Sequence, residues 1–227
     1  MIADALIPAL DEEDTIAAVV DAVRAQPVRQ VVVVDNGSRD RTAERAAGAG
    51  AIVVPEPERG YGAACLRGLA LLQNASPPDA VVFLEADGSD DPSEIPRLLE
   101  ALATHDLVLG SRTRGGAERG ALTPVQRAGN AVVTATIRLL YGRRFSDLGP
   151  FRAVRIEALR RMRLADRDYG FTVEMQVKAL RLGMRVIELP VRRRRRAGGK
   201  SKVSGSLRGV VGAGTKILYT VLRHASG

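Results

Sequence analysis

Residues 31–38 read Val-Val-Val-Val-Asp-Asn-Gly-Ser, and this stretch points to the fold class. Four consecutive β-branched residues predict a strand that is buried on both faces, as strands in parallel sheets are. The polar segment 35–38 then ends the strand in a turn. Strand and helix patterns alternate along the first half, with strands expected at 2–7, 52–54, 81–84 and 107–109 and helices at 16–23, 41–47, 62–72 and 93–103. This alternation predicts a Rossmann-like α/β fold, with a mostly parallel central sheet and helices on both faces.

The second half of the chain has a less regular pattern. Helices are expected at 124–141, 171–182 and 207–223, with one strand at 186–191. Segments 112–120 and 192–206 are rich in arginine and glycine, and we expect mobile loops there. No linker rich enough to separate two domains interrupts the chain. We therefore expect a single domain, 1–227, with a regular half at 1–110, an irregular half at 111–206 and a C-terminal helical segment at 207–227.

Charge is distributed unevenly along the chain. Its 227 residues contain 34 Lys and Arg against 26 Asp and Glu, a formal charge of +8. Residues 1–110 hold 8 of the basic and 19 of the acidic residues, whereas residues 111–227 hold 26 and 7. The run Arg192–Arg196, followed by Lys200 and Lys202, is typical of a solvated strand end or of a surface that attracts phosphates. No aromatic residue lies in the run to stack on bases, so a nucleic-acid partner is disfavoured.

Composition excludes several classes of protein. Apolar residues make up 45% of the chain, which is ordinary for a globular protein and too high for a disordered one. A single cysteine, Cys65, excludes a disulfide framework and a cysteine-based zinc cluster. Acidic residues interrupt the first apolar stretch, and the apolar run at 210–222 contains Lys216 and is too short for a membrane span. We therefore expect a cytoplasmic protein.

Carboxylates follow three of the expected strands. Glu12 comes after the first strand, Asp35 ends the second, and Glu85 and Asp87 follow the strand at 81–84. Any one of them could be a helix cap. Because the carboxyl ends of parallel strands meet at one edge of the sheet, three together indicate a ligand site. Glu85 and Asp87 supply oxygen ligands of the kind that Mg²⁺ and Mn²⁺ prefer.

At this point the sequence resembles the family 2 glycosyltransferases of the GT-A fold, most closely their dolichol-phosphate mannosyltransferase-like branch. The resemblance covers nearly the whole chain. Its motifs are Ile7–Glu12, Val33–Thr42, Arg59–Ala64, Glu85–Pro92, Gly110–Arg112, Gln126–Asn130, Asp147–Arg152 and Tyr169–Glu174. Each motif is weak alone, whereas eight in the right order are specific.

The resemblance implies a donor site in the first half for a UDP- or GDP-linked sugar. The residues implied to bind the nucleotide are Pro8, Ala9, Leu10, Glu12, Asp35, Gly37, Gly60, Gly62, Ala63, Ala86 and Asp87. Among them, Gly60, Gly62 and Ala63 are expected to let the backbone approach the nucleotide closely. The implied cofactor is Mg²⁺ or Mn²⁺, held by Asp87 and Glu85, with Asp90 as a third candidate. Three positions depart from the family pattern: Glu85 stands where Asp is usual, Asn36 replaces an acidic residue, and Asp11 replaces Asn.

On the acceptor side, the resemblance implies a single displacement that inverts the configuration at the anomeric carbon. A hydroxyl acceptor needs a general base, whereas a phosphate acceptor does not. The candidate catalytic carboxylates are Glu174, Asp147 and Asp168. The candidate phosphate-binding residues are Arg112, Arg127, Arg196 and Lys202.

These observations predict an inverting, metal-dependent glycosyltransferase that moves a hexose from a nucleotide-diphosphate sugar to polyprenyl phosphate. One alternative is a transferase for a small soluble, phosphorylated acceptor. Another is a non-catalytic module that binds an anionic surface or nucleic acid, and a third is an inactive sugar-nucleotide binder. The basic half and the helix at 207–223 also suggest peripheral contact with an anionic membrane on its cytoplasmic face. A homodimer is left open.

Overall fold

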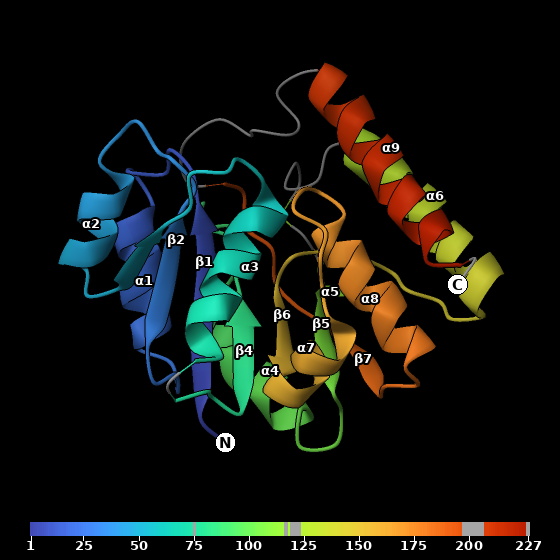
Figure 1. Cartoon of the computed structure of the whole chain (residues 1–227), viewed down its shortest axis with the longest axis horizontal. Helices are drawn as coiled ribbons and strands as arrows, with labels where there is room; N and C mark the ends of the chain where they lie inside the picture. The colour runs from blue at the N-terminus through green and yellow to red at the C-terminus, as the bar shows by residue number, and fades with distance from the viewer. Residues whose placement is uncertain (75, 116–117, 119–123, 197–206, 226–227) are drawn as a thin grey trace.

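The computed structural model describes residues 1–74, 76–115, 118, 124–196 and 207–225. It contains a seven-stranded sheet with the strand order β3-β2-β1-β4-β6-β5-β7 (Figure 1). The strands are β1 (Ala3–Ala9), β2 (Val31–Asp35), β3 (Ile52–Pro55), β4 (Ala80–Phe83), β5 (Leu107–Ser111), β6 (Arg152–Arg155) and β7 (Val186–Pro190). Strand β6 runs antiparallel to both of its neighbours, and the other pairings are parallel. The expected mostly parallel sheet is therefore confirmed.

Helices cover both faces of this sheet. They are α1 (Ile16–Arg24), α2 (Thr42–Gly48), α3 (Tyr61–Leu72), a 3-10 turn (Pro92–Glu94), α4 (Ile95–Ala101), α5 (Arg112–Gly115), α6 (Pro124–Tyr141), α7 (Ile156–Met162), α8 (Phe171–Arg181) and α9 (Leu207–Arg223). The valines of β2 show how the two faces arise. Val31 and Val33 pack into a core with α1 and α4, whereas Val32 and Val34 pack into another with α3 and α8. Since successive side chains of a strand point to opposite faces, the four valines contribute side chains to the apolar core on each face of the sheet.

Strand β6 is an element that the sequence patterns do not predict. It begins and ends with arginine, so it lacks the apolar run that marks the other central strands. Arg152 is 1% exposed, and its guanidinium donates to the carbonyls of Gly149, Pro150 and Thr172. Burial lowers the pKa of Arg152 to about 10. Carbonyl oxygens of a neighbouring loop and of α8 accept hydrogen bonds from this cation and so offset the cost of burying its charge. The hydropathy pattern of residues 152–155 does not reveal these acceptors.

Two segments expected as mobile loops are described only in part. Residues 112–115 form α5 instead of a loop, and 192–196 run along the acidic segment that follows β4. Residues 116–117, 119–123 and 197–206 of these segments lie outside the described residues.

Helices α6 and α9 lie side by side at the end of the molecule opposite α2 (Figure 1). The hydroxyl of Tyr141 in α6 donates to the carbonyl of Val221 in α9 at 2.8 Å. None of the helices that the structure describes is long and apolar enough to cross a membrane.

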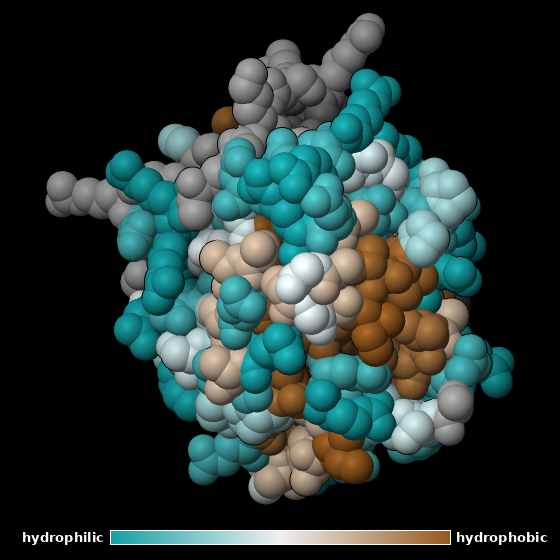
Figure 2. Space-filling view, turned by 90° about the vertical axis from the view of Figure 1, so that its left-hand side faces the viewer, coloured by the Kyte–Doolittle hydropathy of each residue, from teal (hydrophilic) through white to brown (hydrophobic). Residues whose placement is uncertain are grey.

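The opposite end of the molecule carries β3, one of the two edge strands of the sheet. Figure 2 views this end and shows apolar side chains gathered among hydrophilic ones. Ile52 of β3 is 45% exposed there. The strand has only four residues and ends in Pro55, two features that limit pairing of an open edge with another chain.

Candidate active site

The carboxyl ends of β1, β2 and β4 meet, as the strand pattern predicted. The loop after β1 is joined to the loop after β2, because the amide of Asp11 donates to Oγ of Ser38 at 3.0 Å. The hydroxyl of Thr15 donates to the carbonyl of Ala86 at 2.8 Å and so joins the β1 loop to the β4 loop. These contacts bring Glu12, Asp35 and Asp87 to one edge of the sheet.

Asn36 joins the loop after β2 to the beginning of α3. Its side chain is buried; Nδ2 donates to the carbonyls of Glu56 and Glu58 at 3.0 and 2.6 Å, and Oδ1 accepts from the amide of Gly60 at 2.9 Å. A carboxylate in this place could not donate to two carbonyls. The departure at Asn36 therefore has a structural reason in this chain.

The glycines at the beginning of α3 meet another part of this chain. The amide of Ala63 donates to the carbonyl of Arg167 at 2.8 Å. A Cβ at Gly60 would lie 2.2 Å from that carbonyl oxygen, and a Cβ at Gly62 would lie 2.1 Å from the carbonyl oxygen of Asp166. The close approach expected for a nucleotide is thus made by the backbone of residues 166–168. Binding of a nucleotide by Gly60, Gly62 and Ala63 stays a prediction.

Asp87 is a buried, ionised carboxylate at the end of β4. Its side chain is 5% exposed, and its Oδ1 accepts the amide of Ser89 at 3.0 Å and the Ser89 hydroxyl. Burial acts to raise the pKa of Asp87, but the hydrogen bonds from Ser89 and the charges of Arg193 and Arg196 outweigh it and lower that pKa. Ser89 is a residue of this site that the sequence analysis did not select, although it lies inside the motif.

The arginine run pairs with the acidic loop after β4. Arg196 lies between two carboxylates of the sheet edge, with Nε 2.9 Å from Oδ2 of Asp87 and Nη1 3.1 Å from Oε1 of Glu12. The remaining described pairs of the run join Arg192 to Asp91 and Glu94, Arg193 to Glu85 and Asp90, and Arg194 to Asp91. From the sequence, the run was expected to be a solvated strand end or a surface that attracts phosphates. In the structure its arginines instead form ion pairs with carboxylates of the same chain.

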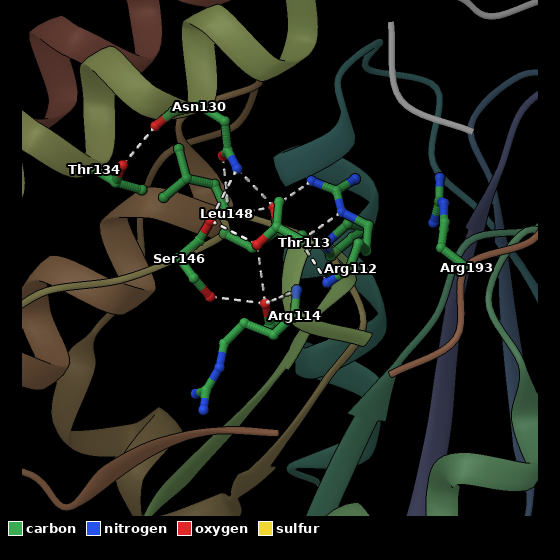
Figure 3. A network of polar contacts seen from close by, with 12 residues as sticks. Arg112, Thr113, Arg114, Asn130, Thr134, Ser146, Leu148 and Arg193 are labelled. Atoms are coloured by element: carbon green, nitrogen blue, oxygen red, sulfur yellow. Dashed lines mark hydrogen bonds and ion pairs between the residues drawn. The ribbon is translucent and has the colours of Figure 1, made fainter. Parts of the chain in front are cut away.

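Asp147 and Arg112 form another largely buried ion pair, at the end of β5. Asp147 is 2% exposed and accepts from Nε and Nη2 of Arg112, each at 2.7 Å, and from Nδ2 of Asn130 at 3.0 Å. Figure 3 shows Arg112 and Asn130 pointing into the same network of polar contacts, with Arg193 to one side. Burial acts to raise the pKa of Asp147, but Arg112 outweighs it and lowers that pKa. Asp147 thus fixes Arg112, and its own oxygens already accept several hydrogen bonds, which favours a positioning role.

Glu174 holds the loop that packs on the α3 glycines. It is 3% exposed and accepts the amides of Ala165 and Asp166 at 3.0 and 2.8 Å. Nζ of Lys178, on the next turn of α8, lies 2.7 Å from Oε1 of Glu174, and Nε2 of His224 lies 3.6 Å from the same oxygen. Through these hydrogen bonds Glu174 holds the loop at residues 165–168 in place. A direct part in catalysis stays a prediction.

The other candidates lie in varied places. Asp168 is half-buried in that same loop, where its amide donates to Oδ1 of Asp166 at 2.9 Å. Arg127 is exposed on α6, and Lys202 lies outside the described residues. Pro8 and Leu10 are half-buried around the end of β1, and Ala9 and Ala86 are buried.

A divalent metal fits this site through Asp87. Within the described residues, no group of three His, Cys, Asp or Glu side chains is arranged to hold a metal ion. Glu85, expected as a second ligand, faces Arg193 instead, with Oε2 2.5 Å from Nη2. Mg²⁺ is commonly bound by one or two carboxylates together with substrate phosphates. Asp87 provides one such carboxylate, with a lowered pKa and next to the loops after β1 and β2.

Comparison with known proteins identifies the family. The model of glycosyl transferase family 2 matches residues 4–163. An uncharacterised glycosyltransferase of Mycobacterium tuberculosis is 40% identical over 208 residues, which cover 91% of this chain and 91% of the relative. The undecaprenyl-phosphate mannosyltransferase of Micrococcus luteus is 33% identical over 219 residues, which cover 91% of this chain and 88% of the relative.

A solved structure agrees with the fold. Glucosyl-3-phosphoglycerate synthase from Mycobacterium tuberculosis, in complex with Mn²⁺, UDP-glucose and phosphoglyceric acid, superposes with a TM-score of 0.77 at 26% identity. The match covers 99% of this chain and 80% of that one. The expected GT-A fold, the resemblance and the expected class of enzyme are thus confirmed. The chain is a glycosyltransferase that belongs to family 2, in its dolichol-phosphate mannosyltransferase-like branch.

Proposed function

We propose that this glycosyltransferase moves a hexose from a nucleotide-diphosphate sugar to polyprenyl phosphate, with inversion at the anomeric carbon and with Mg²⁺ or Mn²⁺. The observation that carries the proposal is Asp87, which is ionised, held by Ser89 and placed beside Glu12 at the carboxyl ends of β4 and β1. A site of this kind suits a ribose and a metal-bound diphosphate. When bound, the metal supplies positive charge that stabilises the leaving diphosphate.

Donor binding in this scheme involves the loops after β1, β2 and β4. Glu12 and Asp35 accept hydrogen bonds from the nucleoside, and Asp87 holds the metal. Arg196 now pairs with Glu12 and Asp87, and its side chain is 27% exposed. It can therefore turn toward the diphosphate, where an arginine fork matches phosphate geometry. Residues 1–110 then make the donor half, and 111–206 the acceptor half.

The acceptor assignment has chemical support from Asp147 and Glu174. Both carboxylates are buried and already accept hydrogen bonds from protein groups, so neither is well placed to take a proton from an acceptor hydroxyl. A phosphate acceptor is anionic and needs no such base. The mannosyltransferase of Micrococcus luteus, named for undecaprenyl phosphate, supports the same class of acceptor.

The α6–α9 layer is suited to peripheral contact with an anionic membrane. Exposed apolar residues on it are Val125, Val132, Leu139, Leu140, Tyr219 and Leu222. Leu139 is 84% exposed, and Arg138 and Arg143 are exposed close to it in the chain. Apolar side chains flanked by arginines suit a bilayer surface, where each basic residue contributes about 1 kcal/mol.

A small phosphorylated acceptor is the second candidate. The solved synthase of 26% identity is in complex with phosphoglyceric acid as well as UDP-glucose. Both candidates offer a phosphate group, and Arg112 and Arg127 are the expected partners for either. They differ in whether a lipid surface is needed.

A transfer assay separates the two acceptors. Purified protein is incubated with UDP-glucose or GDP-mannose, Mn²⁺, and either undecaprenyl phosphate in phosphatidylglycerol vesicles or 3-phosphoglycerate. The proposal predicts a glycolipid with one of the donors and no product with EDTA. NMR of the product anomer then checks inversion. A soluble product alone would favour the second candidate, and no product or donor hydrolysis with any combination would count against both.

A further inference from the structure

Arg193 is the buried member of the arginine run. Only 9% of its side chain is exposed, against 67% for Arg192 and 57% for Arg194. Its backbone forms an antiparallel bridge with Asp90, and the amide of Arg194 donates to the carbonyl of Ser89 at 2.9 Å. The backbone on both sides of this guanidinium is therefore fixed, unlike that of an arginine on an open surface.

The guanidinium of Arg193 is shared between two carboxylates. Nη2 lies 2.5 Å from Oε2 of Glu85, and Nη1 lies 2.7 Å from Oδ1 of Asp90. The Asp90 side chain is 2% exposed, and its other oxygen accepts the amide of Glu85 at 3.0 Å. One buried cation thus pairs with two carboxylates and joins Glu85 to Asp90 within the loop that follows β4.

Asp87 lies between these two residues in the sequence but has a different partner. Its Oδ2 pairs with Arg196, whose side chain is 27% exposed, whereas Arg193 is 9% exposed. The partner of Asp87 can therefore leave more easily than the partner of Glu85 and Asp90. Of the three carboxylates, Asp87, whose own side chain is 5% exposed, is the one with a partly exposed arginine partner, whereas Glu85 is 30% exposed but its arginine partner is buried.

We propose that Arg193 is an internal cation that keeps Glu85 and Asp90 away from the metal, so that Asp87 is the only carboxylate of this loop that binds it. This inference rests on the proposed function, because the metal is the one that accompanies the nucleotide-diphosphate sugar. A single carboxylate binds a divalent ion weakly, and the diphosphate must supply further oxygens. Arg193 is thus a positioning residue whose charge makes metal binding depend on the nucleotide.

The test removes the internal cation. In Arg193→Met the buried side chain keeps an apolar body, and Glu85, Asp87 and Asp90 become three carboxylates of one loop without the shared guanidinium. The protein is titrated with Mn²⁺ in the absence of nucleotide, and free Mn²⁺ is followed by electron paramagnetic resonance. We expect Arg193→Met to bind Mn²⁺ at least about tenfold more tightly than the wild type. Mn²⁺ alone is also expected to raise the melting temperature of the variant and not that of the wild type.

Two further variants keep the test decisive. Arg192→Met removes a neighbouring, exposed charge and should leave Mn²⁺ binding as in the wild type. Glu85→Gln keeps the size of the side chain and provides a result if Arg193→Met does not fold. With Arg193 present, Glu85→Gln should leave the affinity for Mn²⁺ with UDP nearly unchanged, whereas Asp87→Asn should lower it by roughly 100-fold.

Two results would overturn the inference. One is a folded Arg193→Met that binds Mn²⁺ alone as weakly as the wild type. The other is a Glu85→Gln that loses as much affinity for Mn²⁺ with UDP as Asp87→Asn does. Failure of the proposed function has a different signature, namely wild-type protein that binds neither UDP nor GDP with Mn²⁺. The titration of Arg193→Met with Mn²⁺ alone does not depend on that outcome.

Discussion

Nε of Arg196 lies 2.9 Å from Oδ2 of Asp87, so the carboxylate proposed to bind the metal is paired with an arginine of the run Arg192–Arg196. Arg196 also contacts Glu12, and these pairs join the acidic first half of the chain to its basic second half. The site is thus held together by charges that a bound metal and diphosphate would rearrange.

Replacement of Arg196 should reduce turnover more than stability. In Arg196→Gln the diphosphate loses a charged hydrogen-bond donor as it leaves, and we expect kcat to fall by about 100-fold. Because the side chain is 27% exposed, the melting temperature should change little. Arg192→Gln, which alters a side chain that is 67% exposed, is the matched control and should retain the wild-type kcat. Equal losses of kcat in the two variants would contradict a specific role for Arg196.

Gly62 should not tolerate a side chain. A Cβ there would lie 2.1 Å from the carbonyl oxygen of Asp166, so Gly62→Ala must displace the loop at 166–168. We expect a loss of about 2 kcal/mol in the free energy of unfolding, measured in urea. Gly129→Ala on α6 has no atom within 4 Å of the added Cβ and should stabilise the protein by about 0.5–1 kcal/mol. Gly62→Ala as stable as the wild type would show that this contact is not tight.

Glu174 should act through the loop that it holds rather than as a general base. Glu174→Gln keeps one acceptor oxygen for the amides of Ala165 and Asp166 but loses the charge that pairs with Lys178. We expect a lower melting temperature and an unchanged shape of the profile of kcat/KM against pH. Loss of the acidic limb of that profile, with the fold intact, would instead identify Glu174 as the base.

The Asp147–Arg112 pair should make stability depend on pH. Because the pKa of Asp147 is lower in the folded than in the unfolded protein, its contribution is present above the ordinary Asp pKa of about 3.9. The contribution is lost as the pH falls through the lowered pKa of the folded state. Asp147→Asn should therefore be about 3 kcal/mol less stable than the wild type at pH 7, with a smaller difference at acidic pH. A difference that is constant with pH would exclude a charge effect.

The sequence predicts the first half of the fold better than the second. The β2 valines predict that the strand is buried, and the polar turns after β1, β2 and β4 mark the edge of the sheet where ligands are expected. Both signals could be read because each lies within a few residues of sequence. Strand β6 was missed because Arg152 is made tolerable by carbonyls from Gly149 and Thr172, which only the fold brings near. Residues 112–115 were expected as a loop, yet they form a helix beside the Asp147 pair.

The candidate site shows the same division. The strand-end carboxylates were identified from spacing, and Asp87 occupies the expected place. The partners of the arginine run could not be read from the sequence, because five adjacent arginines look alike until the fold separates buried Arg193 from exposed Arg192. The glycines at the beginning of α3 were expected to let a nucleotide approach, which stays a prediction, and in the structure the backbone of Asp166 and Arg167 lies against them.

The most direct test of the proposed donor site is calorimetric titration with UDP and with GDP, each in Mn²⁺ and in EDTA, for the wild type and for Asp87→Asn. The account predicts that one nucleotide binds the wild type in Mn²⁺, and that EDTA or Asp87→Asn weakens this binding by roughly 100-fold. Equal binding in EDTA, or an unchanged affinity in a folded Asp87→Asn, would contradict the claim that Asp87 holds the metal.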